Sequence, residues 1–191
     1  MKRFFTALLL SLLFCSFASA ESIVIYFSRA DENYSVGTVE KGNTQVLAEI
    51  IASKTGSSLF HVERAASYPK DYNSCIKEAQ NEQKKNARPE LKMTMSQKDF
   101  DRYDTVYLGS PVWWGDLPMA MYTFIESLDW TGKTVYLFGT HEGSGANCLE
   151  SGFKKVAKGC VLKGKVLSMY GHDAQKNDAK EREAVEKWLS K

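Results

Sequence analysis

Residues 107–118 read Tyr107-Leu-Gly-Ser-Pro-Val-Trp-Trp-Gly-Asp-Leu-Pro118, and the fold prediction starts from this stretch. The apolar run 106–108 is typical of a buried strand, and Gly109-Ser-Pro111 ends it abruptly. The loop that follows carries two adjacent tryptophans, Trp113 and Trp114. In an open α/β sheet, ligands bind outside the carboxyl ends of the strands, so this loop predicts a platform for a flat ring. The equally weighted alternative is that both tryptophans belong to the core or to a partner contact.

Four further runs rich in β-branched and aromatic residues predict strands at 22–28, 58–63, 134–140 and 166–170. Segments with helical spacing or helix-compatible composition separate them, at 44–55, 71–87, 119–128, 148–156 and 178–189. This alternation predicts an α/β fold, a three-layer α/β/α sandwich with a five-stranded parallel sheet. Of the compatible strand orders, 2-1-3-4-5 brings the ends of strands one and three together at the switch point.

The chain after the first strand has the features of an anion site. A polar segment, 29–41, leads to Gly42-Asn43-Thr44, where a helix is predicted to begin with Asn43 or Thr44 as its N-cap. A helix N-terminus at a strand end presents backbone N–H groups to an anion. The segment is not a phosphate-binding P-loop, and it lacks the Gly-x-Gly-x-x-Gly of dinucleotide-binding folds. An ordinary capped helix is the alternative.

The first twenty residues have the pattern of a secretory signal peptide. Lys2 and Arg3 precede an apolar run, 4–17, which ends at Ala18-Ser-Ala20. We therefore expect a signal peptide at 1–20 and one mature domain at 21–191. The alternative is an uncleaved membrane anchor, but the run is shorter than the roughly 20 apolar residues of a membrane span.

Composition excludes several function classes. Cleavage after Ala20 would leave 23 acidic residues and a net charge near zero, so no strongly basic surface for nucleic acid is implied. The chain has no Cys-x-x-Cys and no histidine cluster, so no metal site is predicted. Of the three mature cysteines, Cys148 and Cys160 would lie about 18 Å apart along a helix, too far for a disulfide. Pairing of Cys75 with either remains open.

Together these features resemble the flavodoxin family over nearly all of the mature chain. The resemblance rests on the strand 23–28 with its downstream Gly-Asn-Thr, on Gly109-Ser-Pro-Val-Trp-Trp-Gly115, and on the turn Glu142-Gly-Ser-Gly145. In the family these segments are the phosphate loop and the two loops that flank the flavin ring. The resemblance therefore implies a flavodoxin-like fold with FMN as the cofactor.

The resemblance also implies which residues bind the cofactor. They are Ser28, Arg29, Asn43 and Thr44 at the phosphate, Pro111, Val112, Trp113, Trp114 and Gly115 at the isoalloxazine, and Glu142, Ser144 and Gly145 at its pyrimidine end. No residue is assigned a catalytic role, and His141 and His172 are interpreted as surface or loop residues. Two features depart from the family: an insertion of about ten residues splits the phosphate loop, and the balanced charge contrasts with the acidic surface of typical members.

The expected function is FMN-dependent electron transfer with a protein partner, in the periplasm or outside the cell. The partner itself cannot be read from the sequence, and neither nucleic-acid binding nor stable membrane insertion after signal cleavage is expected. One alternative is an FMN-dependent NAD(P)H:quinone-type reductase. Another is a flavin-free binding module that has kept the fold.

Overall fold

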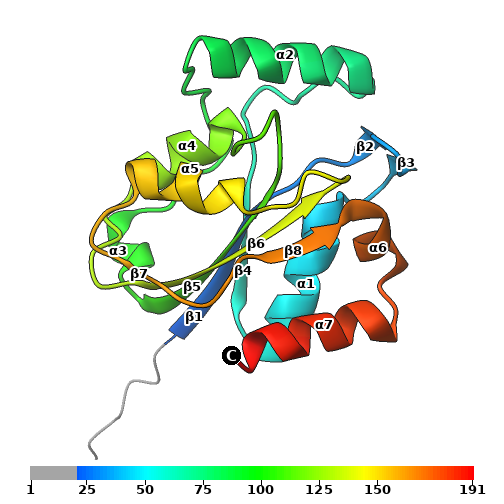
Figure 1. The fold of residues 1–191 in the computed structure, drawn as a ribbon. Coiled ribbons are helices and arrows are strands. Elements are labelled where there is room, and N and C mark those ends of the chain that lie inside the picture. The colour runs from blue at the N-terminus through cyan, green and yellow to red at the C-terminus, as the bar shows by residue number, and fades with distance from the viewer. Residues whose placement is uncertain (1–20) are drawn as a thin grey trace, which may run out of the picture.

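The computed structural model describes residues 21–191, so the predicted signal peptide lies outside the described residues. Its main sheet has six strands, all parallel, in the order β4-β1-β5-β6-β7, with β8 also paired to β6 (Figure 1). The strands are β1 (Glu21–Phe27), β4 (Ser58–Val62), β5 (Tyr103–Pro111), β6 (Thr134–His141), β7 (Val161–Leu162) and β8 (Leu167–Tyr170). The α/β prediction is confirmed, and the order agrees with 2-1-3-4-5 along β4, β1, β5 and β6.

The predicted number of five strands is wrong, because two short strands share the fifth position. β7 pairs with Thr134 and Val135, whereas β8 pairs further along β6, from Phe138 to His141. Between them the chain passes through Gly164, whose φ of +64° lies in the left-handed region. A strand of only two residues leaves no alternating pattern in the sequence, so β7 was missed.

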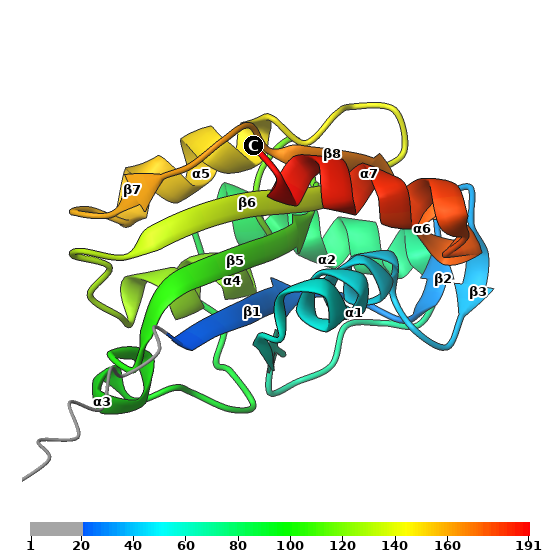
Figure 2. The ribbon, with the colours of Figure 1, turned by 90° about the horizontal axis from the view of Figure 1, so that it is seen from below.

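Helices cover both faces of the sheet (Figure 2). One face carries α1 (Asn43–Thr55), α6 (Gly171–Lys176) and α7 (Ala179–Leu189), and the other carries α4 (Met119–Glu126) and α5 (Cys148–Val156). Side chains of β1 alternate between the two resulting cores: Ile23 and Ile25 lie in one, Val24 and Tyr26 in the other. A strand buried on both faces reads as a continuous apolar run, which is why β1 was recognisable.

Three elements lie outside this plan. The inserted segment folds into a hairpin of β2 (Asp31–Asn33) and β3 (Gly37–Val39), which the sequence did not predict. Helix α2 (Tyr72–Lys84) lies beyond the carboxyl ends of the strands rather than flat against the sheet (Figures 1 and 2). A short helix, α3 (Gln97–Phe100), precedes β5. The hairpin and α2 thus lie at the edge of the sheet where ligands are expected.

The N-terminus of α1 is capped from a distance. Its N-cap residue is Gly42, not Asn43 or Thr44 as predicted, and Gly42 has no side chain to accept a hydrogen bond. The Ser28 hydroxyl supplies the acceptor instead, taking the Gln45 backbone N–H at 3.0 Å. Gly42 allows this close approach, because a Cβ there would lie 2.2 Å from Ser28 Oγ.

Gly109, in the middle of β5, is required by the packing of its neighbour. It is paired in register with Phe138, and a Cβ at Gly109 would lie 2.0 Å from the Phe138 ring. We expect Gly109→Ala to lower the free energy of unfolding by about 3 kcal/mol, because a fully buried ring must move. Urea unfolding measures this, and the added change Phe138→Leu should restore part of the loss. An unchanged midpoint in the single variant would contradict the packing described.

His61 packs within the sheet. Its ring stacks on Tyr26 at 4.7 Å between centroids, and Nε2–H donates to the Ser28 carbonyl at 3.2 Å. Burial lowers the pKa of His61 below its usual value. The native state therefore resists protonation, and stability should be full above about pH 6.5 and decline at lower pH, where the unfolded chain binds the proton first.

His61→Phe keeps an aromatic stack and removes the titrating group. Urea unfolding between about pH 7.5 and 5.5 should show a shallower decline for this variant than for the wild type. Some decline is expected to remain, because burial also lowers the pKa of His141. Parallel pH profiles for the two proteins would show that His61 does not contribute.

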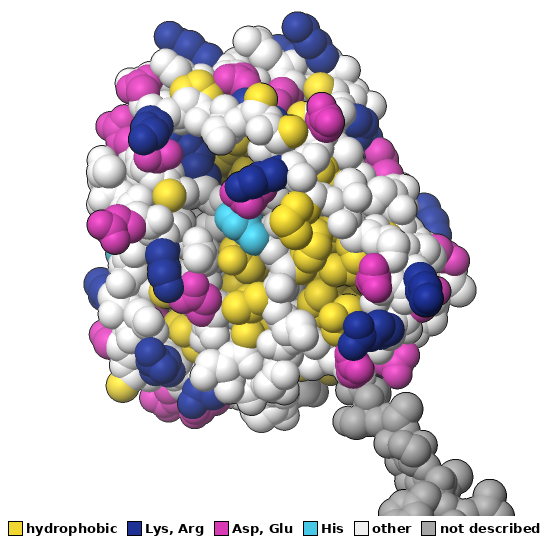
Figure 3. All heavy atoms as spheres, turned by 180° about the vertical axis from the view of Figure 1, so that it is seen from behind, with side chains coloured by type: hydrophobic (Ala, Val, Ile, Leu, Met, Phe, Trp, Pro, Cys, Tyr) yellow, Lys and Arg dark blue, Asp and Glu magenta, His cyan; other side chains and the backbone are white. Residues whose placement is uncertain are grey.

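No helix within 21–191 has the length and apolar character needed to cross a membrane. Over the same residues, no cluster of His, Cys, Asp and Glu forms a metal site, and Cys75, Cys148 and Cys160 are free thiols. On the face drawn in Figure 3, acidic and basic side chains are interspersed. That face therefore carries no extended field of one sign.

Candidate functional site

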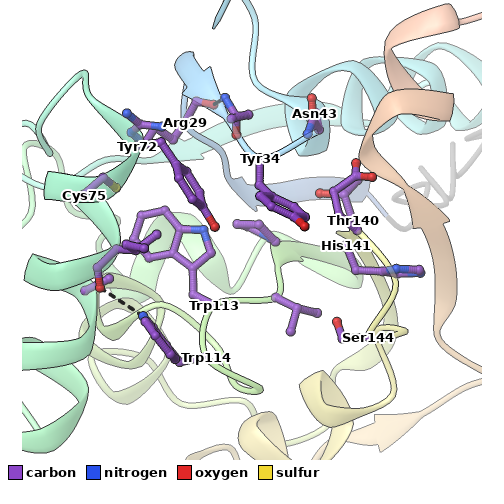
Figure 4. A pocket seen from close by; sticks show the side chains of 16 residues that line it. Arg29, Tyr34, Asn43, Tyr72, Cys75, Trp113, Trp114, Thr140, His141 and Ser144 are labelled. Carbon is purple, nitrogen blue, oxygen red and sulfur yellow. Dashed lines mark hydrogen bonds between the residues drawn. The ribbon is translucent and has the colours of Figure 1, made fainter. Parts of the chain in front are cut away.

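A cavity of about 310 Å³ lies at the carboxyl ends of β1, β5 and β6 (Figure 4). Eight of the twelve residues predicted to bind the cofactor line it: Arg29, Asn43, Pro111, Val112, Trp113, Trp114, Glu142 and Ser144. They come from four segments far apart in the sequence, so the fold assembles one site from the loops that the sequence singled out. The other four predicted residues, Ser28, Thr44, Gly115 and Gly145, do not line the cavity.

Those four residues shape the structure around the cavity without lining it. Ser28 caps α1, and the Thr44 hydroxyl is buried against the Thr140 hydroxyl at 2.7 Å, which ties α1 to β6. Gly115 and Gly145 have φ values of +74° and +69° and shape the two loops that flank the cavity.

The two tryptophans are held in a tight turn. Trp113 and Asp116 exchange backbone hydrogen bonds, and the two residues between them, Trp114 and Gly115, both have positive φ, as in a type I′ turn. A bulky residue is strained in that conformation by roughly 1–2 kcal/mol. Contacts from α2 hold it there: the Trp114 indole N–H donates to the Ile76 carbonyl at 3.0 Å, and Gln83 donates to the Trp114 carbonyl at 3.2 Å.

Trp113 is oriented by aromatic packing. Its ring meets Phe27 and Tyr68 edge to face, with centroids 5.2 Å and 4.9 Å apart. Such contacts favour one orientation of the indole. Trp113 therefore presents a fixed, half-buried surface to the cavity, whereas Trp114 is 49% exposed.

The polar end of the cavity offers donors to an anion. Arg29 donates from its two terminal nitrogens to the carbonyls of Glu32, Pro69 and Lys70, at 2.5 to 2.6 Å. Its Nε is buried and has no hydrogen-bond partner among residues 21–191. The backbone N–H groups of Asn43 and Thr44 open α1 beside it, before the first intrahelical bond from Val46 to Gly42. An unpaired buried donor and a helix N-terminus together suit a phosphate group.

Eight residues that line the cavity were not predicted: Asn33, Tyr34, Tyr72, Cys75, Ile76, Ala79, Thr140 and His141. Most belong to the hairpin and to α2, for which the sequence predicted only a polar segment at 29–41 and a helix at 71–87. Tyr34 and Tyr72 were the available signal, as aromatic residues in otherwise polar segments. Nothing in the local pattern placed either segment over the ends of the strands.

Two histidines pack against Tyr170 beside the cavity. The Tyr170 ring centroid lies 4.6 Å from that of His141, which lines the cavity, and 5.1 Å from that of His172. Glu142 accepts hydrogen bonds from the backbone N–H of His172 at 2.9 Å and from its ring Nδ1 at 2.7 Å. The Glu142 carboxylate is thereby held in place at the cavity wall.

Comparison with known proteins identifies the family. A sequence model described as flavodoxin matches residues 23–191. No curated protein matches the chain significantly. Among solved structures, a protein from Bacteroides eggerthii named as a flavoprotein is 26% identical, with a TM-score of 0.69 over 90% of this chain and 97% of that one.

Two more distant structures share the fold. A flavoprotein from Lactobacillus acidophilus in complex with FMN is 22% identical, with a TM-score of 0.61 over 90% of this chain and 99% of its own. Oxidised flavodoxin 2 from Bacillus cereus is 18% identical, with a TM-score of 0.54 over 90% and 96% of the two chains. Because the family match extends over nearly all of residues 21–191, the chain belongs to the flavodoxin family.

Proposed function

We propose that this protein binds FMN in the cavity and transfers electrons to or from a protein partner, in the periplasm or outside the cell. The observation that carries the proposal is the cavity itself, which joins the unpaired Arg29 Nε and the α1 N-terminus to the Trp113 surface. The cofactor is FMN, the group present in the structure of the Lactobacillus acidophilus relative.

The lining residues fit the parts of FMN. Arg29 Nε–H and the first amides of α1 would hold the phosphate, Val112 and Trp113 would pack against the isoalloxazine, and Ser144 and Glu142 would lie at its polar edge. When bound, FMN supplies the reversible electron chemistry. The protein's part is to bind the ring and exclude water. An apolar wall such as Trp113 raises the cost of negative charge on the ring, which lowers the potential for forming an anionic reduced state.

An exported location is part of the proposal. Support comes from the signal-like pattern of residues 1–20 and from β1, which begins at Glu21, so cleavage after Ala20 would leave the sheet intact. The protein would then take up FMN after export. The intact mass of protein from the periplasmic fraction tests this, and a full-length mass in the cytoplasmic fraction would refute it.

An absorbance spectrum of the purified protein, with and without added FMN, tests cofactor binding. We expect a flavin spectrum that saturates at one FMN per chain, and a colourless protein that does not bind FMN would contradict the proposal. Anaerobic reductive titration then tests electron transfer, for which we expect two separable one-electron steps. Rapid steady-state oxidation of NADH or NADPH would instead indicate the reductase alternative.

A further inference from the structure

Helix α2, which lines one side of the cavity, is held in place largely by polar contacts. Of its thirteen residues only Cys75 and Ala79 are buried, so little apolar surface fixes the helix. Glu78 and Glu82, one turn apart on α2, both form ion pairs with Arg64, which follows β4. The Arg64 side chain is only 10% exposed, so water and salt screen these contacts little.

The two carboxylates differ in one contact. Glu82 also accepts a hydrogen bond from the Tyr68 hydroxyl at 2.6 Å, whereas among residues 21–191 the Glu78 carboxylate bonds only to Arg64. Burial, together with the bond to Glu82, raises the pKa of Tyr68, so the phenol stays protonated and remains the donor. The Arg64 guanidinium lies over the Tyr68 ring, 3.8 Å from its centre. Tyr68 is therefore held both at its hydroxyl and at its face.

Tyr68 passes this constraint on to the cavity. Its ring meets the Trp113 indole edge to face at 4.9 Å, and Trp113 lines the cavity (Figure 4). Neither Tyr68 nor Glu82 is among the lining residues. A shift of the Tyr68 ring would thus change the direction that Trp113 faces without removing any group that lines the site.

We propose that Glu82 is a positioning residue for the FMN site of the proposed function, on which this inference rests. Through the hydroxyl and ring of Tyr68, Glu82 fixes the orientation of Trp113, against which the isoalloxazine packs. Because the indole is oriented before FMN arrives, less conformational freedom is lost on binding, and FMN affinity is higher than it would be with a mobile indole. The ion pair between Glu82 and Arg64 supports this arrangement by holding the carboxylate at the Tyr68 hydroxyl.

Glu82→Ala tests the proposal in two ways. Titration of the apoprotein with FMN should show binding weakened by about 5- to 20-fold, because Tyr68 loses a charged hydrogen-bond acceptor and no longer fixes the indole. The near-UV circular dichroism of the apoprotein gives a reading that needs no cofactor. The contribution of Trp113 is the difference between the wild type and Trp113→Phe, and Glu82→Ala should lose more than about half of it, because a mobile ring gives a weak signal.

Three matched variants separate the Tyr68 bond from general anchoring of α2. Glu82→Gln keeps a hydrogen bond to Tyr68 in either orientation of its amide, so FMN affinity should stay within about threefold of the wild type. Glu78→Ala removes the other carboxylate of Arg64 and should change FMN affinity less than about twofold. Tyr68→Phe keeps the ring but loses the bond, and it should weaken FMN binding by about 3- to 10-fold. Urea unfolding must show each variant to be folded at the assay temperature.

Either of two results would overturn the proposal. One is unchanged FMN affinity and an unchanged Trp113 signal in folded Glu82→Ala. The other is an equal loss of affinity in Glu78→Ala and Glu82→Ala, which would mean that the Arg64 ion pairs act by anchoring α2 and that the bond to Tyr68 has no separate role. A wild-type protein that binds no FMN would refute the proposed function, whereas the spectra of the apoprotein would still show whether Glu82 orients Trp113.

Discussion

Trp113→Ala is expected to weaken FMN binding by about 2–4 kcal/mol, a factor of about 30 to 1,000 in Kd. Trp113 presents a large apolar surface to the cavity, and its ring is held between Phe27 and Tyr68 before any ligand arrives. Little conformational entropy is then lost when a flat ring packs against it, so most of the contact free energy appears as affinity. Titration of the apoprotein with FMN, followed by flavin fluorescence, measures the change.

Trp113→Phe is the matched control, because it keeps an aromatic ring of smaller area. It should lose less than half of the binding free energy lost by Trp113→Ala. Trp113 also packs against the core, so both variants must be shown by urea unfolding to be folded at the assay temperature. Unchanged FMN affinity in a folded Trp113→Ala protein would show that this indole is only a core residue, the alternative that the sequence left open.

Arg29→Ala should lower both stability and FMN affinity. The substitution removes the donor to three backbone carbonyls that join the hairpin to the start of α2, and we expect it to reduce the free energy of unfolding by about 2–3 kcal/mol. FMN affinity should fall by a further factor of about ten or more, because the Nε donor at the polar end is lost as well. Urea unfolding and FMN titration measure the two effects separately.

Arg29→Lys separates charge from geometry. Lysine keeps the positive charge but has no planar fork, so it cannot donate to the three carbonyls in the same way. We expect it to recover only part of the stability. Hydrogen exchange gives a local check, since amides of 31–39 should lose protection in both variants. Wild-type protection of the hairpin in Arg29→Ala would show that Arg29 does not anchor it.

Much of the architecture was readable in the sequence because the relevant signals are local. The buried run of β1 and the helical spacing of α1 depend on neighbouring residues only. The predicted strand end at Gly109-Ser-Pro111 was wrong, because β5 runs on to Pro111, where these three residues pair with β6. Local signals also indicated the loops that contribute Pro111 to Trp114 and Glu142 to Ser144, since strand ends in a parallel sheet meet at one edge.

What the sequence by itself determined is therefore the alternation of strands and helices, the family, and the part of the site formed by the loops at the strand ends. Only the tertiary structure decided the part of the site formed by the hairpin and α2, and the capping of α1. The contacts concerned join residues that are distant along the chain. Tyr34 of the hairpin lies beside Tyr72 of α2, both line the cavity at the strand ends, and Ser28 accepts a hydrogen bond from Gln45. Such contacts leave no periodic pattern, because they depend on how separate segments pack in space rather than on the conformational preference of any one segment.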